Sequence, residues 1–107
     1  MSFYIKQDDT TPSMRADLKN GSGDAVDLIN TTVRLHMRAI GSTVATIDAA
    51  AVVISEAGGT VQYDWVAGDT SATGSYQVEF EVTYSDGTVE TFPNDGYIRV
   101  QILEDIA

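Results

Sequence analysis

Residues 68–93 read GDTSATGSYQVEFEVTYSDGTVETFP, and large apolar side chains fill every second position at the centre of this stretch. Those positions are Tyr76, Val78, Phe80, Val82 and Tyr84, and the positions between them hold Gln77, Glu79, Glu81 and Thr83. A period of two predicts a long strand with one buried face and one solvated face. The Asp86-Gly87 pair tolerates the positive φ angles of a tight turn, so residues 89–92 are expected to return as the partner strand of a hairpin.

The same alternation predicts further strands on both sides of this hairpin. They cover residues 3–6, 14–18, 31–39, 61–65 and 98–102. Pro12 lies in the polar segment 7–12 and cannot donate a hydrogen bond to a sheet, so we expect this segment to form a switch or a bulge between two strand halves. Residues 43–47 alternate weakly and residues 49–54 are apolar without alternation, a pattern in which helix and strand are hard to separate. The β-branched run Val52-Val53-Ile54 favours a strand.

About seven to nine short strands, with turns at regular spacing and no helix, predict an all-β protein built as an antiparallel two-layer β-sandwich. The length of 107 residues suits a single domain, residues 1–107. At this size, folding buries roughly two-thirds of the surface of the unfolded chain, which is enough for one modest core. The sequence has no cysteine, which excludes disulfides, thiol nucleophiles and cysteine metal sites.

The formal net charge is −10, from 16 acidic and 6 basic residues. Such an acidic surface repels phosphate backbones and anionic lipids, so neither nucleic acid nor membrane is expected as a partner. It favours solubility, association with cations or docking onto a basic surface. The N-terminal sequence MSFYIKQDD has no basic leader before an apolar core, and no apolar run is long enough to span a bilayer. We therefore expect the chain to fold in the cytoplasm in which it is made.

The side chains that could carry catalysis are few. His36 is the only histidine, whereas zinc sites usually use two or more histidine or cysteine ligands. None of the serines lies in a G-x-S-x-G nucleophile elbow. Glu79 and Glu81 share one strand face, and Glu90 could face them across the hairpin as part of an acid–base pair. A flat sheet face lacks the cleft that such a pair needs, so we expect a solvated acidic face and no enzyme.

We expect no cofactor, with calcium as an alternative. Aspartates are frequent in the expected loops, and calcium takes six to eight oxygen ligands from such loops. They are Asp8, Asp9, Asp24, Asp27, Asp69, Asp86 and Asp95. The sequence has no EF-hand calcium loop, and aspartate also occurs in turns because its side chain bonds to nearby backbone.

Two further features each leave two interpretations open. Arg34, His36 and Arg38 alternate with apolar residues, so they form either a solvated strand face or a small basic strip that contacts a partner. Trp65 is the only tryptophan, and it shares the parity of Val61 and Tyr63. We interpret it as a core residue, with an exposed binding aromatic as the alternative.

The segment around Tyr76 carries a fold-specific pattern. Asp69 is followed by Ala72-x-Gly74-x-Tyr76-x-Val78. This pattern resembles the tyrosine corner of immunoglobulin-like sandwiches, in which a tyrosine near the start of a strand bonds its hydroxyl to nearby backbone. We therefore expect Asp69, Gly74 and Tyr76 to have structural roles in an immunoglobulin-like β-sandwich.

Short stretches along the chain also follow one another in a characteristic order. They are PSMRADL at 12–18, VDL at 26–28, VRLHMR at 33–38, VQYDW at 61–65, GDT at 68–70, GSY at 74–76, EF at 79–80 and FP at 92–93. This order, from about Asp9 to Ile102, resembles the immunoglobulin-like domain at the N-terminus of tailed-phage baseplate upper proteins and its small stand-alone relatives in phage and prophage genomes. The sequence ends at Ala107 without the coiled coil or receptor-binding region of the baseplate proteins, which shifts the expectation from the baseplate itself to a virion-associated structural role.

The resemblance implies a non-enzymatic structural or adaptor protein in the baseplate, tail, neck or capsid decoration of a virion. It would act through contacts with other virion proteins or with further copies of itself. The first expected strand, with Phe3, Tyr4 and Ile5, has few charges and could pair with a neighbour at a sheet edge. The alternative function is a module that binds carbohydrate on a host surface, for which Tyr4, Tyr97 and Trp65 would be the exposed aromatics.

Overall fold

The computed structural model describes residues 2–106, which contain eight β-strands and no helix. The strands are β1 (Ser2–Lys6), β2 (Met14–Asp17), β3 (Thr32–Ala39), β4 (Ala45–Ser55), β5 (Thr60–Tyr63), β6 (Gly74–Thr83), β7 (Val89–Phe92) and β8 (Ile98–Leu103). The all-β class expected from the sequence is confirmed. Of the expected domain 1–107, Met1 and Ala107 lie outside the described residues.

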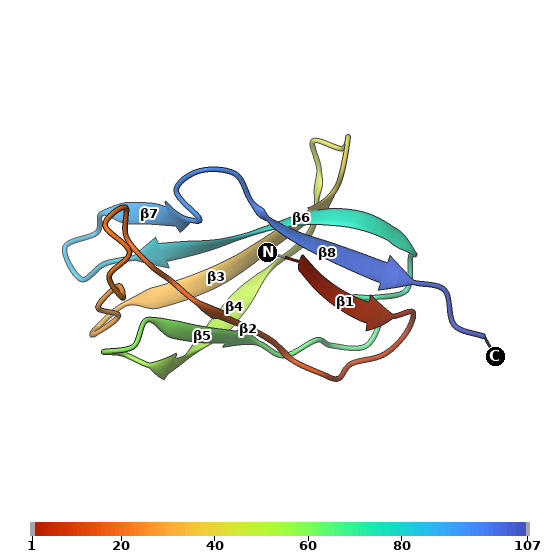
Figure 1. The fold of residues 1–107 in the computed structure, drawn as a ribbon, viewed down its shortest axis with the longest axis horizontal. Helices are drawn as coiled ribbons and strands as arrows, with labels where there is room; N and C mark the ends of the chain where they lie inside the picture. The colour runs from red at the N-terminus through yellow and green to blue at the C-terminus, as the bar shows by residue number, and fades with distance from the viewer. Residues whose placement is uncertain (1, 107) are drawn as a thin grey trace.

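The strands form one sheet with the hydrogen-bonded order β1-β8-β6-β3-β4-β5-β2, and β7 pairs with β6. This sheet curls nearly into a barrel, with β6 and β8 along one side and β2 and β5 along the other (Figure 1). All pairs are antiparallel except β1 with β8, which is parallel, so the expectation of a purely antiparallel arrangement is wrong. The parallel pair is possible because the whole length of the chain separates β1 from β8, and no tight turn has to join them.

Strand β4 explains why the hydrogen bonds do not divide into two separate sheets. Residues 45–51 of β4 pair with β3, whereas residues 52–55 pair with β5 and include a bulge between Val53 and Ser55. Bulges bend a strand and increase its twist, so β4 carries the sheet around from one wall to the other. The preference for a strand over a helix in residues 49–54 is confirmed.

The expected switch around Pro12 is also confirmed. Strand β1 pairs with β8, and β2, which follows after residues 7–13, pairs with β5 at the opposite end of the sheet order. The indole Nε1 of Trp65 donates a hydrogen bond to the carbonyl of Pro12 at 3.1 Å. This bond ties the linking segment to the core.

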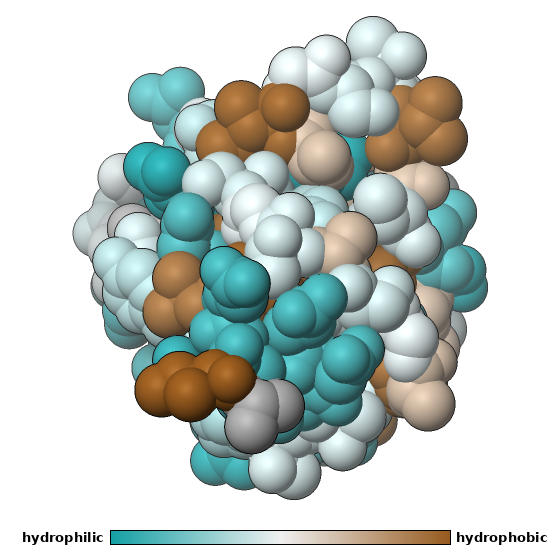
Figure 2. Space-filling view, turned by 90° about the vertical axis from the view of Figure 1, so that its right-hand side faces the viewer, coloured by the Kyte–Doolittle hydropathy of each residue, from teal (hydrophilic) through white to brown (hydrophobic). Residues whose placement is uncertain are grey.

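Exposed apolar side chains are spread over the surface. The end of the molecule that faces the viewer in Figure 2 shows separate hydrophobic groups between hydrophilic ones rather than one broad apolar area. Single exposed apolar residues of this kind are normal for a folded protein. Tyr4, Val44 and Ile106 are among the most exposed, at 62%, 70% and 97% of their surface.

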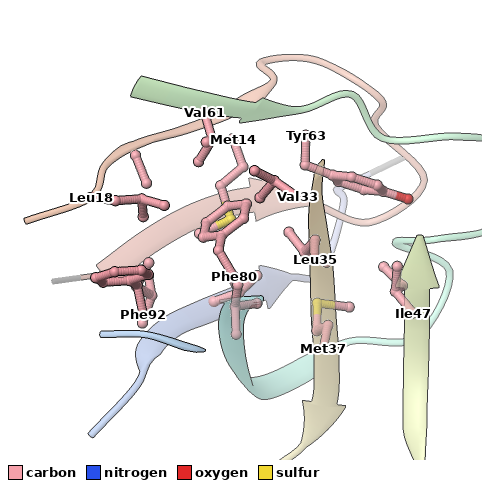
Figure 3. Packing of buried hydrophobic residues seen from close by; sticks show 14 of the residues in the cluster. Met14, Leu18, Val33, Leu35, Met37, Ile47, Val61, Tyr63, Phe80 and Phe92 are labelled. Atoms are coloured by element: carbon pink, nitrogen blue, oxygen red, sulfur yellow. The ribbon is translucent and has the colours of Figure 1, made fainter. Parts of the chain in front are cut away.

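The core fills the interior of the curled sheet (Figure 3). Inward positions on β3 and β6 alternate with outward ones, so Leu35, Val78 and Phe80 are fully buried. Phe80 lies directly opposite Phe92 in the β6–β7 hairpin. Burial of each side chain of this size contributes about 1.5–3 kcal/mol relative to leaving it exposed. Trp65 is 4% exposed, which confirms its placement in the core.

Candidate functional site

An open hollow of about 540 Å³ lies over the outward face of the sheet where β3, β4 and β6 run side by side. It is lined by His36, Met37, Arg38, Thr43, Ala45, Asp48, Gln77, Glu79 and Tyr97. Ligand pockets commonly have volumes of about 300–1,000 Å³. This hollow is therefore the candidate functional site.

Strand register brings the polar groups of the hollow together. His36 on β3 lies opposite Asp48 on β4 and opposite Glu79 on β6. Arg38, two residues further along β3, lies opposite Gln77. Because successive residues of a strand point to opposite faces, all these side chains emerge on the outward face while Met37 points into the core. Met37 is 1% exposed.

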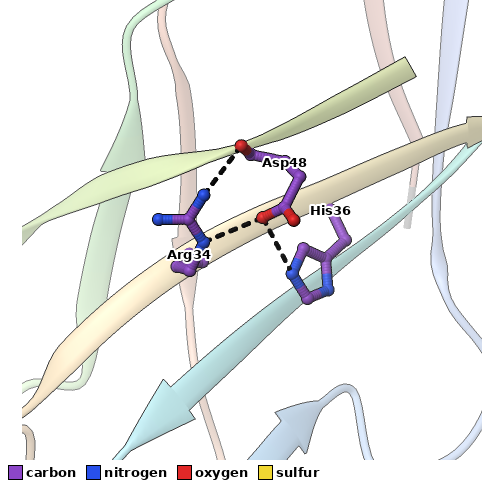
Figure 4. A network of polar contacts seen from close by, with 3 residues as sticks. All are labelled: Arg34, His36 and Asp48. Carbon is purple, nitrogen blue, oxygen red and sulfur yellow. Dashed lines mark hydrogen bonds and ion pairs between the residues drawn. The ribbon is translucent and has the colours of Figure 1, made fainter. Parts of the chain in front are cut away.

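Asp48 is the centre of a small polar network (Figure 4). Its Oδ1 accepts a hydrogen bond from Arg34 Nε at 2.8 Å and lies 3.2 Å from His36 Nε2. A terminal nitrogen of Arg34 also donates to the Asp48 carbonyl at 2.8 Å. The hydrogen bond from Arg34, and then the charges of Arg34 and His36, hold the pKa of Asp48 below its ordinary value of 3.8. The carboxylate thus orients two side chains of β3.

The remaining polar groups of the hollow keep free hydrogen-bonding capacity. Arg38 Nε donates to Gln77 Oε1 at 2.8 Å. Within residues 2–106, the terminal nitrogens of Arg38, the amide nitrogen of Gln77 and the Glu79 carboxylate make no hydrogen bond or ion pair. Tyr97, immediately before β8, is 42% exposed and forms part of the wall. The arrangement can therefore bind a polar ligand.

The structure places Arg34, His36 and Arg38 on one solvated face, as alternation predicted, but not as a free basic strip. Arg34 and His36 contact Asp48, and Arg38 bonds to Gln77. Sequence reasoning missed Asp48. Its signal was a single acid between the weakly alternating residues 43–47 and the apolar residues 49–54.

The expectation that Glu90 could face Glu79 and Glu81 is wrong. In the register of the hairpin, Thr91 lies opposite Glu81, and Glu90 lies opposite the buried Val82. The turn over residues 84–88 sets this register, and its length places Glu90 on the opposite face from the other two acids. Glu90 instead accepts a hydrogen bond from the Tyr84 hydroxyl at 2.7 Å.

The loop aspartates are dispersed. In the part of the chain that the structure describes, no three histidine or acidic side chains gather closely enough to hold a metal ion. Several of these aspartates bond to nearby backbone instead. Asp27 Oδ1 accepts from the Ile29 amide at 3.1 Å, and Asp86 Oδ1 accepts from the Thr88 amide at 3.0 Å. The calcium alternative has no ligand set here.

The expected tyrosine-corner segment makes a specific hydrogen bond. The Tyr76 hydroxyl donates to the carbonyl of Ala72, four residues upstream, at 2.6 Å. Tyr76 is buried, and burial raises the pKa of its hydroxyl. Gly74, at the start of β6, has a φ of 141°, which favours glycine. Asp69 acts separately, because its Oδ2 accepts from the Tyr63 hydroxyl at 2.6 Å.

Of the first-strand residues expected to form an interaction edge, only Tyr4 is largely exposed. Ile5 is buried, and the ring of Phe3 packs near Trp65 with centroids 5.9 Å apart. Trp65 is buried and therefore cannot be an exposed carbohydrate-binding aromatic, which leaves Tyr4 and Tyr97 from that proposed set.

No family model matches this sequence, and no curated protein matches it. Residues 2–106 contain no helix of the length and apolarity required to cross a membrane.

Proposed function

We propose that this protein is a non-enzymatic structural or adaptor module of a tailed-phage particle and that it acts through protein–protein assembly. The proposal rests on the ordered stretches that resemble the N-terminal immunoglobulin-like domain of baseplate upper proteins. It includes an immunoglobulin-like arrangement of the strands. The observation that supports it most is the hydrogen bond from Tyr76 to the Ala72 carbonyl, because a tyrosine corner is a feature of immunoglobulin-like sandwiches.

The outer edge of β1 is a surface through which such a module could assemble. Strand β1 lies at one end of the sheet order, so one of its edges has no neighbouring strand. The Gln7 amide donates to the Leu103 carbonyl at 2.7 Å. Alternate residues of a strand direct their backbone N–H and C=O groups to opposite edges. The backbone groups of Phe3 and Ile5 therefore face β8, and those of Tyr4 face the free edge. An extended segment of another virion protein, or of a second copy, could add there as a strand.

The function is tested by purifying phage particles from a lysogen that encodes this chain and analysing their proteins by mass spectrometry. The proposal expects the chain in the particles at a fixed stoichiometry to the structural proteins. Consistent absence from purified particles would contradict it. Multi-angle light scattering then distinguishes a self-assembling component, which forms a defined oligomer, from an adaptor, which stays monomeric until its partner is added.

The edge is tested by Tyr4→Lys, because a lysine on an edge strand opposes pairing with another strand. Removal of residues 1–7 would be a poor test, since Phe3 and Ile5 pack in the core and their loss would disturb the fold. Val66→Lys is the matched control, because Val66 is a comparably exposed residue in a loop. We expect Tyr4→Lys to weaken incorporation into particles or self-association and Val66→Lys to leave both unchanged.

A further inference from the structure

The hollow over β3, β4 and β6 is close to electrically neutral in a strongly acidic chain. Arg38, Asp48 and Glu79 line it, and Arg34, which lies outside the lining, pairs with the Asp48 carboxylate. The charges of these four residues cancel, whereas the whole chain carries a net charge of −10. A ligand with a net charge of either sign would gain little there, because groups of both signs lie within the same small area. The site therefore suits a neutral ligand.

The same hollow offers donors and acceptors side by side. The terminal nitrogens of Arg38 and the amide nitrogen of Gln77 can donate, and the Glu79 carboxylate can accept. Arg38 and Gln77 lie opposite each other on β3 and β6, and Glu79 is two residues from Gln77 on the same strand. The bond from Arg38 Nε to Gln77 Oε1 fixes the orientation of both side chains. A ligand with several hydroxyl groups, each both donor and acceptor, matches this set.

Tyr97 supplies an apolar surface beside these groups. Tyr97 is 42% exposed and lines the hollow, and Thr43 of the β3–β4 connection and Ala45 at the start of β4 contribute to the lining as well. An aromatic ring beside a few oriented polar groups is a common composition for small-molecule sites. A purely apolar ligand would cover Arg38 and Glu79 without pairing them, and burial of unpaired polar groups opposes binding.

We infer that this hollow binds a neutral saccharide, with its hydroxyl groups bonded to Arg38, Gln77 and Glu79 and its C–H face against Tyr97. This inference goes beyond assembly and does not depend on it. A particle component with this site could contact glycans on the cell surface, and a protein outside any particle could bind sugar in the same way.

The test is a titration of isotope-labelled protein with glucose, glucosamine and glucuronic acid, followed by amide chemical shifts in NMR spectra. These three sugars share one ring and differ in charge. We expect saturable shifts with glucose at amides of β3, β6 and the start of β8, and weaker binding of the two charged analogues. N-acetylglucosamine and methyl β-galactoside extend the neutral set to sugars with other substituents and stereochemistry.

Two variants locate the site. Arg38→Gln removes the guanidinium donors, and it should weaken binding by about tenfold or more, as expected for hydrogen bonds to a charged group. Arg15→Gln is its matched control. Arg15 also bonds to the glutamine opposite it, Gln62, through Nε at 3.1 Å, but it lies on β2 and lines none of this hollow. Tyr97→Leu keeps an apolar wall without the aromatic ring and should also weaken binding.

The outcomes separate clearly. Absence of saturable shifts with every neutral sugar would overturn the inference, as would equal losses in the Arg38 and Arg15 variants. Tighter binding of either charged analogue would overturn the assignment to neutral saccharides. Thermal unfolding of each variant shows whether a loss of binding comes from a loss of folding. Detection of the chain in virions addresses the proposed assembly function separately.

Discussion

Three buried or partly buried tyrosines use their hydroxyl groups to tie parts of the chain together. Tyr76 donates to the Ala72 carbonyl, Tyr63 donates to Asp69, and Tyr84 donates to Glu90, with distances between 2.6 and 2.7 Å. The first two bonds hold the loop between β5 and β6 from both sides. The third joins the end of β6 to β7. At the scale of single residues, these bonds fix the loops that the strands alone would leave less constrained.

Tyr76→Phe should lower the free energy of unfolding by about 1–2 kcal/mol without changing the fold. The phenylalanine fills the same space, but the Ala72 carbonyl loses its donor in a partly buried site. Urea unfolding monitored by fluorescence measures the difference. Tyr4→Phe is the control, because Tyr4 is 62% exposed, and its change should be within about 0.5 kcal/mol. Equal effects of the two substitutions would show that the Tyr76 bond contributes no specific stability.

Tyr84 should make stability depend on pH in the alkaline range. Burial, followed by the hydrogen bond to Glu90 and its charge, raises the pKa of Tyr84 from 10.0 to about 12. Between these values the unfolded chain loses the proton while the folded chain retains it, so the unfolded state binds fewer protons and stability falls as the pH rises. The stabilisation from the protonated Tyr84 hydroxyl is fully present below the pKa of Tyr84 in the unfolded chain. It is lost as the pH rises through the pKa of Tyr84 in the folded protein.

Urea unfolding at pH values across this interval tests the Tyr84 prediction. We expect a smaller loss of stability in Tyr84→Phe than in the unsubstituted protein, because the phenylalanine side chain cannot ionise. Tyr63 and Tyr76 also have raised pKa values from burial, so some loss should remain in the variant. Identical pH profiles would contradict the role of Tyr84.

At the scale of elements, the turn between β4 and β5 packs closely against neighbouring backbone. Gly59 has a φ of 68°, and a Cβ placed there would lie 2.7 Å from the Leu18 carbonyl oxygen and 2.9 Å from that of Val26. Real Cβ atoms do not approach backbone oxygens so closely, so the turn requires glycine for space as well as for backbone conformation. Here the turn packs against the chain that follows β2.

Gly59→Ala should therefore destabilise the protein by about 2–4 kcal/mol, the sum of a strained left-handed residue and an overpacked contact. Gly41→Ala separates the two causes. Gly41 has a φ of 89° but open space around it, so we expect a loss of only about 1–2 kcal/mol from the backbone conformation. Thermal unfolding of both variants provides the comparison. If the Gly59 variant is no less stable than the Gly41 variant, the backbone near Leu18 and Val26 can shift to accommodate the methyl group with no loss of stability.

Elements with clear alternation could be predicted from the sequence, and pairings between distant elements could not. The hairpin of β6 and β7 was predictable because a period of two and a turn dipeptide act over short range. The direction of β1 against β8 was not, because alternation is the same for parallel and antiparallel strands. Strand β4 lacked a clear pattern because the apolar residues Val52 and Ile54 occupy exposed positions between its more buried ones.

The candidate site was predictable only in part, because it too depends on pairings between distant strands. Arg34, His36 and Arg38 could be placed on one face from β3 alone. Asp48 joins them through the register of β3 with β4, and Tyr97 joins them through its position immediately before β8. Both depend on how the whole sheet is assembled. The face on which Glu90 lies depends on the length of the turn between β6 and β7. A turn longer or shorter by one residue would move the Glu90 side chain to the other face of the sheet.

At the scale of the whole molecule, repulsion between like charges opposes folding. The chain carries 16 acidic and 6 basic residues. Among residues 2–106, ion pairs form only at Asp48, with Arg34 and with His36 when it is protonated. Favourable pairs therefore cannot offset the excess of negative charge, and the compact state concentrates that charge in a body with extents of 46 × 26 × 23 Å.

Added salt should therefore raise the unfolding temperature at neutral pH. At about 10 mM salt the Debye length is about 30 Å, comparable to the whole molecule, whereas at about 150 mM it is about 8 Å and only neighbouring charges interact. Thermal unfolding by circular dichroism in sodium chloride at these two concentrations measures the shift. The control is the same pair of measurements near the isoelectric point of about 4.1, where the net charge and its repulsion vanish and the shift should disappear. An unfolding temperature that falls with salt at neutral pH would contradict this prediction and would mean that the ion pairs of Asp48 outweigh the repulsion. In that case the Asp48→Asn variant should no longer show the fall.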